Sequence, residues 1–150
     1  MESLYPILKS AHSGWRYIVL ILLVVALLQA LAGWFGKKGY TEGNRKLNVF
    51  TLISAHIQFL FGLALYFIGK WFAVDSSVAV GRYWKMEHIA IMLLAIVLIT
   101  IGNSRSKKIT DGTAKHKAIA IFFGLALILI IGSIFMMVKN DPSRSFFGVS

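Results

Sequence analysis

The sequence predicts an all-α integral membrane protein, an up-down bundle of four helices, from three observations. Hydrophobic residues make up 57% of the chain, whereas soluble domains are typically about 45–50% apolar. Mean hydropathy is +0.73. The apolar residues are concentrated in four runs, each near or above the roughly 20 residues that a membrane-spanning helix needs. We therefore expect one membrane domain over 1–150, with spans at about 6–35, 47–72, 82–102 and 114–138 and a short polar tail at 139–150.

The ends and one face of these runs carry residues that suit membrane helices. Pro6 fits the first turn of the first helix, where a missing N–H breaks no hydrogen bond. Ala26, Ala30 and Gly33 recur at helical spacing, which predicts a stripe of small residues where a neighbouring helix approaches closely. Tryptophans at the ends of the runs are typical of the aromatic belt at a membrane surface. They are Trp15, Trp34, Trp71 and Trp84.

The formal net charge of +10 comes largely from basic residues in the connections between the apolar runs. Such residues fix orientation and contact anionic headgroups, and without a basic face interleaved with aromatics they do not predict nucleic-acid binding. Because basic residues favour the cytoplasmic side, we expect the two basic connections there and both termini outside. These connections hold Lys37, Lys38, Arg45, Lys46, Arg105, Lys107, Lys108, Lys115 and Lys117.

The absence of cysteine narrows the cofactors that the chain can hold. It excludes disulfides, iron–sulfur clusters, thiolate metal sites and covalently attached c-type haem. A redox cofactor therefore needs histidine or methionine ligands. The sequence also contains no phosphate-cradling glycine loop, no HExxH motif and no nucleophile elbow, so nothing in it predicts a water-soluble catalytic domain.

Each apolar run carries one histidine, and two of the four histidines match in depth. His12 lies three residues before Trp15 and His88 lies four residues after Trp84, so both are expected near the outer interface. Their helices run in the same direction and should occupy one diagonal of the bundle. This arrangement predicts a clamp for a flat cofactor, with haem ligation as the leading interpretation. Headgroup or partner contacts, and a hydrogen-bonded network with Glu87, are the alternatives.

The other two histidines differ in depth. His56 lies about nine residues beyond Leu47, roughly 13 Å into the membrane. An ionisable group at that depth predicts either a ligand or quinone contact or a structural hydrogen bond, for which Gln29 on the first helix is the expected partner. His116, between two lysines, is interpreted as a solvated residue at the inner interface.

Two further side chains lie one turn from the matched histidines. Arg16 follows His12 on the same helical face, where it can pair with a haem propionate or with Glu87, or extend to the headgroups. Met92 lies one turn below His88 and is interpreted as a pliable core residue.

Three short stretches carry a family resemblance: the HSGxR stretch at His12–Arg16, the His-Ile-Gln stretch at His56–Gln58, and the pair Glu87-His88. In these stretches the chain resembles small four-span bacterial membrane proteins labelled cytochrome-b-like. The resemblance implies a non-covalent b-type haem, respiratory electron transfer and the bacterial inner membrane. The dihaem pattern, with two histidines on each of two helices, is absent.

The leading hypothesis is a membrane electron carrier or respiratory-complex subunit that holds haem b between His12 and His88. Arg16 and His56 are further cofactor-binding candidates, and a quinone is a second candidate ligand. Such a protein exchanges electrons with a redox partner or other membrane subunits. The alternative is a cofactor-free structural or assembly subunit of a larger membrane complex. A third hypothesis, a transporter or proton relay that uses His56, Gln58 and Glu87, is disfavoured because no span is broken by glycine and proline.

Overall fold

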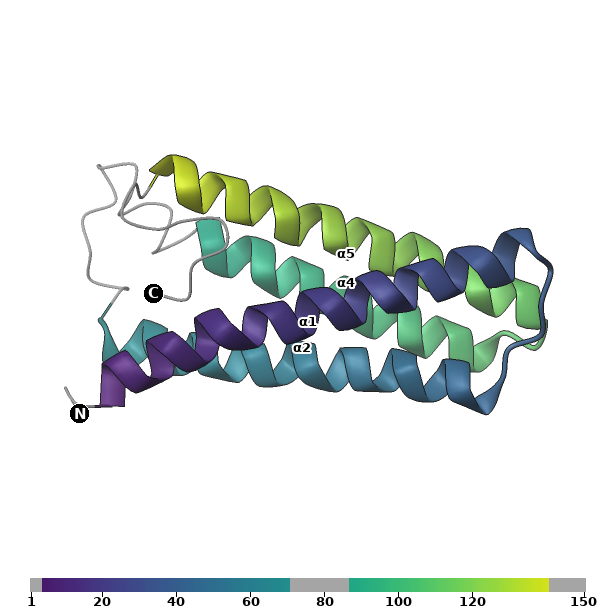
Figure 1. The fold of residues 1–150 in the computed structure, drawn as a ribbon, viewed down its shortest axis with the longest axis horizontal. Coiled ribbons are helices and arrows are strands. Elements are labelled where there is room, and N and C mark those ends of the chain that lie inside the picture. The colour runs from purple at the N-terminus through teal and green to yellow at the C-terminus, as the bar shows by residue number, and fades with distance from the viewer. Residues whose placement is uncertain (1–3, 71–86, 141–150) are drawn as a thin grey trace.

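Four long helices form an up-down bundle in the part of the chain that the structure, a computed structural model, describes, namely residues 4–70 and 87–140 (Figure 1). The helices are α1 (Leu4–Phe35), α2 (Glu42–Ile68), α4 (His88–Lys108) and α5 (Gly112–Asn140). Short connections join α1 to α2 and α4 to α5 at the same end of the bundle (Figure 1). The predicted all-α, four-helix class is confirmed.

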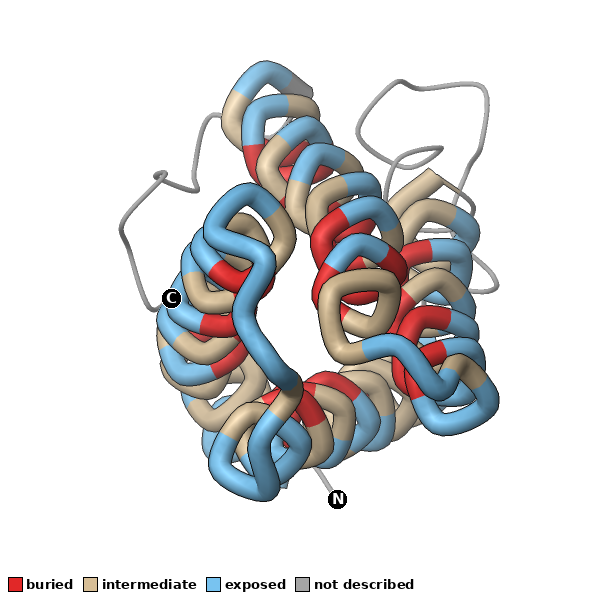
Figure 2. Tube along the Cα trace, turned by 90° about the vertical axis from the view of Figure 1, so that its right-hand side faces the viewer, coloured by how far each residue is buried: buried red, intermediate tan, exposed pale blue. Residues whose placement is uncertain are grey.

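The helices pack in a ring in which each contacts two neighbours. α1 packs against α2 and α5, α4 packs against α5, and the contact between α2 and α4 is the least extensive of these. α1 and α4 therefore lie on one diagonal and α2 and α5 on the other, as expected for an up-down bundle. Seen along the bundle, the buried residues gather on the sides that face other helices, and the exposed residues lie outside (Figure 2).

The outer surface of the bundle is apolar, as a lipid environment requires. All four helices are long and apolar enough to cross a membrane. Large apolar side chains point outward from each helix and stay at least half exposed, a distribution that is unfavourable in water and neutral in lipid. They include Ile21, Leu28, Leu60, Leu94 and Ile128. The chain is accordingly a multi-pass membrane protein.

α2 begins at Glu42 rather than at the predicted residue 47. Thr41 forms a capping box with Asn44: Thr41 Oγ1 accepts the Asn44 N–H at 3.1 Å, and Asn44 Oδ1 accepts the Thr41 N–H at 2.8 Å. This motif starts a helix on polar residues, which an apolar run does not reveal. At its other end α2 stops at Ile68, with Gly69 as the C-cap, before the predicted limit at 72.

α4 continues to Lys108, beyond the predicted limit at 102. Its polar last turns are held inside the bundle, since Asn103 and Ser106 are both buried. Asn103 Nδ2 donates to the carbonyls of Ile99 at 3.2 Å and of Asn48 on α2 at 3.4 Å. The helix therefore extends through side chains that hydropathy assigns to a connection.

α5 also exceeds the predicted span of 114–138. It begins at Gly112 because the carboxylate of Asp111 accepts the Ala114 N–H at 3.1 Å, as an N-cap does. The predicted start of the third span at 82 lies outside the described residues, as do Trp71, Trp84 and the tail from 141.

Glycines at the connection end allow α1, α5 and the first connection to approach closely. Ala26, Ala30 and Gly33 of the predicted stripe are all buried. A Cβ at Gly33 would overlap the His116 ring on α5, and a Cβ at Gly112 would lie 2.8 Å from the Tyr40 backbone nitrogen. Small side chains at these positions are therefore a packing requirement.

Gly33→Ala is expected to lower the free energy of unfolding by about 1–3 kcal/mol, because the added methyl group displaces the His116 ring. Gly132→Ala is the matched control, since a Cβ at Gly132 meets nothing within 4 Å. It should be neutral or stabilising by up to about 1 kcal/mol through helix propensity. Equilibrium unfolding in detergent measures both values, and equal effects would contradict the close contact.

Candidate functional site

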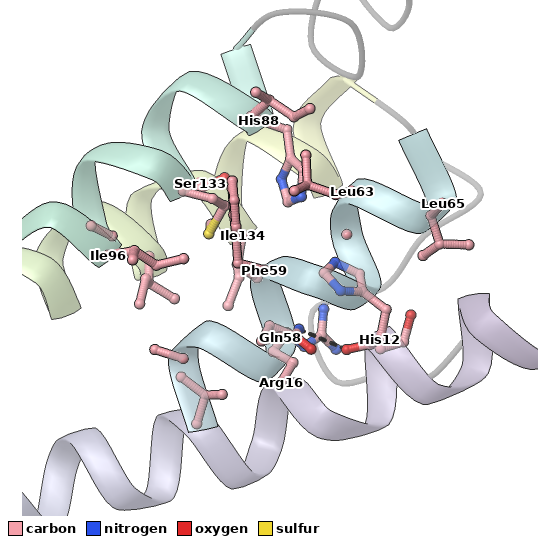
Figure 3. A pocket seen from close by; sticks show the side chains of 18 of the residues that line it. His12, Arg16, Gln58, Phe59, Leu63, Leu65, His88, Ile96, Ser133 and Ile134 are labelled. Carbon is pink, nitrogen blue, oxygen red and sulfur yellow. Dashed lines mark hydrogen bonds between the residues drawn. The ribbon is translucent and has the colours of Figure 1, made fainter. Parts of the chain in front are cut away.

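A cavity inside the bundle, at the end away from the two connections, is the candidate site. It has a volume of about 170 Å³ and is lined by side chains from all four helices. Most of the lining is apolar, with Val19, Phe59, Leu63, Met92 and Ile96 among its residues. His12 enters it from α1 and His88 from α4, and the two rings point toward one another (Figure 3).

The two histidine rings lie at a defined distance and angle. Their centroids are 6.1 Å apart, and the ring planes are almost perpendicular, at 86°. His12 lies two turns into α1 and His88 is the first residue of α4, so their matched depth brings them together across the diagonal. The geometric pairing that the sequence predicts is therefore present.

Two hydrogen bonds between α1 and α2, one donated by each helix, fix the position of His12. Gln58 Nε2 on α2 donates to the backbone carbonyl of His12 at 2.7 Å. One turn further along α1, Trp15 Nε1 donates to the backbone carbonyl of Ser54 at 2.9 Å. Bonds of this kind hold helices together in lipid, where no water competes for the donors.

Gly62 provides the space for the His12 ring. A Cβ at this position would lie 3.3 Å from His12 Cε1, so a larger residue would push the ring toward the cavity centre. Gly62 follows Gln58 by one turn on α2, and the same helical face both bonds the His12 backbone and accommodates its ring. The sequence analysis missed Gly62, although its spacing from Gln58 was a usable signal.

Basic side chains give the cavity its charge. Within the described lining, the only charged residues are Lys9 and Arg16. Arg16 donates to the Tyr17 hydroxyl at 3.0 Å, and its guanidinium carbon lies 4.9 Å from the centre of the Tyr17 ring. The cavity therefore combines an apolar lining with two basic side chains, which suits an apolar molecule that carries acidic groups.

His56 lies outside this site. Its side chain is exposed on the outer surface of α2, and its Nδ1 lies 2.9 Å from the carbonyl oxygen of Leu52 on the same helix. The predicted hydrogen bond between Gln29 and His56 is wrong, because the two side chains face different directions: Gln29 lines a cavity at the connection end. The structure therefore brings Arg16, but not His56, to the pair of His12 and His88.

His116 is buried, so its prediction as a solvated interface residue is wrong. Only 2% of its surface is exposed. The ring lies against Gly33, its centre is 5.1 Å from that of Tyr40, and Nε2 lies 3.1 Å from the Gly39 carbonyl oxygen. The flanking lysines suggested a solvated position, whereas Gly33 was the signal for a ring inserted between helices.

The donor set limits the kind of metal centre that the cavity can hold. Within residues 4–70 and 87–140, no group of three or more histidines or acidic residues is arranged to bind a metal ion. A pair of histidines suits an iron whose other ligands come from a macrocycle, as in haem. The same pair is too small for a structural zinc site, which needs four protein ligands.

Comparisons with known proteins give no match from which a function could be inferred. The chain matches no family model, no curated protein and no solved structure. The cavity and its histidine pair therefore carry the functional interpretation.

Trp15→Phe is expected to lower the free energy of unfolding by about 1 kcal/mol, because it removes the hydrogen bond to Ser54 and keeps an aromatic ring in place. Trp34→Phe is the matched control, since Trp34 stacks on Phe35 and makes no side-chain hydrogen bond within the described residues. Equilibrium unfolding in detergent measures the difference. Equal losses for both variants would show that the bond to Ser54 contributes nothing.

Proposed function

We propose that the protein is a b-type cytochrome of a bacterial inner membrane, which holds one haem between His12 and His88 and transfers electrons. The geometry of the two rings is the observation that carries this proposal. Two imidazole nitrogens that bound one metal ion at about 2 Å each would leave their ring centres about 6 Å apart. The observed separation is 6.1 Å.

The chemistry of the lining also supports a haem. The chain contains no cysteine, so a haem here is held without covalent attachment, as a b-type haem is. Lys9 and Arg16 in the cavity lining suit the two propionate groups, because charge-assisted hydrogen bonds to carboxylates are strong in an apolar setting. The apolar residues around the two rings would exclude water from the haem.

The bundle must repack to admit a macrocycle. The cavity of about 170 Å³ is smaller than the roughly 300–1,000 Å³ that is typical of ligand sites. Met92 and Leu63 are half-buried and have several rotamers, so they can turn away from the cavity centre. The seam between α2 and α4 is the least extensive of the four helix contacts, and we expect the bundle to widen there.

The side chains around the site have separate tasks in this proposal. A haem supplies a one-electron redox couple when it is bound. His12 and His88 would hold the haem iron, and Gln58 and Gly62 fix the place of the His12 ring. Arg16 places positive charge beside the site and so influences the reduction potential.

The proposed orientation puts the cavity on the outer side of the membrane. Nine lysines and arginines lie in or beside the two connections, and positive charge favours the cytoplasmic side. The cavity is at the opposite end of the helices. Its proposed electron partners are a quinone dissolved in the lipid, or a neighbouring membrane or soluble redox subunit on that side.

The purified protein is expected to show a Soret band and the sharp bands of a low-spin haem after reduction with dithionite. His12→Ala and His88→Ala should each remove this spectrum and weaken haem binding by more than about ten-fold, because each removes one axial ligand. His56→Ala is the matched control and should keep the spectrum of the unchanged protein.

Two outcomes would contradict the haem proposal. One is a protein that carries no haem after expression with haem supplied in excess; co-purification with another membrane protein would then favour the structural subunit. The other is a low-spin spectrum that persists in His12→Ala.

Arg16→Gln is expected to keep the low-spin spectrum and to lower the midpoint potential by tens of millivolts. The reason is that removal of a positive charge favours the oxidised form, and a tenfold change in a one-electron equilibrium corresponds to about 59 mV. Arg105→Gln, at the connection end of α4, is the control and should leave the potential unchanged. A spectroscopic redox titration measures both values, and a raised potential in Arg16→Gln would contradict this role.

A further inference from the structure

A second cavity lies at the connection end of the bundle, on the opposite side of the protein from the histidine pair. It has a volume of about 390 Å³. Gln29 and Gly33 of α1, the first connection, the start of α2 and His116 of α5 form its lining. The proposed electron transfer makes no use of this cavity.

His116 presents a polar atom to this cavity that the protein leaves unused. The ring is 2% exposed, and Nε2 lies 3.1 Å from the Gly39 carbonyl oxygen, an acceptor, so Nε2 carries a proton. Among the residues that the structure describes, no hydrogen-bond partner is within reach of His116 Nδ1. A buried polar atom without a partner is costly, and a ligand in the cavity supplies one.

Gln29 offers a second unused group, deeper in the same cavity. Its Nε2 is buried and has no hydrogen-bond partner within residues 4–70 and 87–140. Gln29 precedes the end of α1 by six residues, about 9 Å along the helix. It therefore provides an amide donor on the apolar side of the cavity, below the connections.

The electrostatics of the cavity favour an anion. Lys38 is the only charged residue in the described lining. α2 begins next to the lining residues Thr41 and Asn44, and His116 lies one turn from the start of α5. The positive ends of two helix dipoles therefore converge here. The nearby Glu42 is exposed, lies outside the lining and is paired with Arg45.

We propose that this cavity binds a phosphate group, and that in the membrane this is the phosphate of an anionic phospholipid. Lys38 and the His116 ring, whose Nδ1 has no partner among the described residues, match the phosphate oxygens. The cavity lies where the apolar surface of α1 ends, at the depth of lipid headgroups. A lipid also has ester carbonyls on its apolar side, and these match the donor of Gln29, which a free phosphate leaves unpaired.

Thermal unfolding of the full chain in a non-ionic detergent tests this site, with three additives compared. Dioctanoyl phosphatidylglycerol is expected to raise the unfolding temperature to a plateau, as saturable binding to the folded protein does. Dioctanoylglycerol, which has the same chains and no phosphate, should have no effect. Inorganic phosphate should act only at concentrations at least about ten-fold higher, because it lacks the bond to Gln29.

Neighbouring lysines provide matched variants. Lys38→Gln should weaken the binding of phosphatidylglycerol by about ten-fold, because it removes a charge-assisted hydrogen bond from an exposed position where folding is unaffected. Lys37→Gln removes the same charge one residue away and outside the lining, and should change binding by less than about two-fold. Gln29→Leu should bring the affinity for the phospholipid close to that for inorganic phosphate.

Several results would overturn the proposal. One is an unfolding temperature that phosphatidylglycerol does not raise to a plateau, and another is an equal rise with dioctanoylglycerol. A third is an equal loss of phospholipid affinity in Lys37→Gln and Lys38→Gln, which would indicate that diffuse surface charge attracts the lipid. If the unchanged protein binds inorganic phosphate and phosphatidylglycerol with equal affinity, the cavity is a phosphate site but its ligand is not a phospholipid.

Discussion

The bundle depends on one helix, α2, that turns its polar residues inward. In lipid, apolar surfaces gain little by meeting each other, so hydrogen bonds and close packing decide which helix faces pair. Thr51 and Ser54 lie buried on the inner face of α2, where the Ser54 carbonyl accepts from Trp15 of α1. Asn48, at the connection end, accepts through its carbonyl from Asn103 of α4. These bonds set the rotation of α2, and with it the positions of both neighbours.

Both cavities are bordered by a histidine ring that lies over a glycine of another helix. The His12 ring of α1 occupies the space above Gly62 of α2, and the His116 ring of α5 occupies the space above Gly33 of α1. In each case the missing side chain lets a polar ring enter the bundle without separating the helices. The two rings then present nitrogen atoms at opposite ends of the interior, where each lines a cavity.

Hydropathy and helix direction predicted the four-helix class and the meeting of His12 with His88, because both follow from the length and order of apolar runs. The burial of His116 could not be predicted in the same way, since it depends on how the first connection folds back so that Gly39 reaches the ring. The outward position of His56 depends on the rotation of α2, which its hydrogen bonds set. Depth along a helix is readable from sequence, whereas the direction in which a side chain points requires the packing.

An apolar layer in the middle of the bundle limits what the two cavities can do together. Leu23, Ile99 and Phe123, from three different helices, are completely buried between the level of His12 and that of His116. The Thr51 hydroxyl, which is buried beside this layer, is bonded to the carbonyls of Leu47 and Leu22, and the His56 side chain faces outward. A haem held by His12 and His88, as proposed, would lie nearer to partners at the end of the bundle away from the connections. The cavity at the connection end, with the proposed phospholipid bound, would anchor that end of the bundle in the lipid.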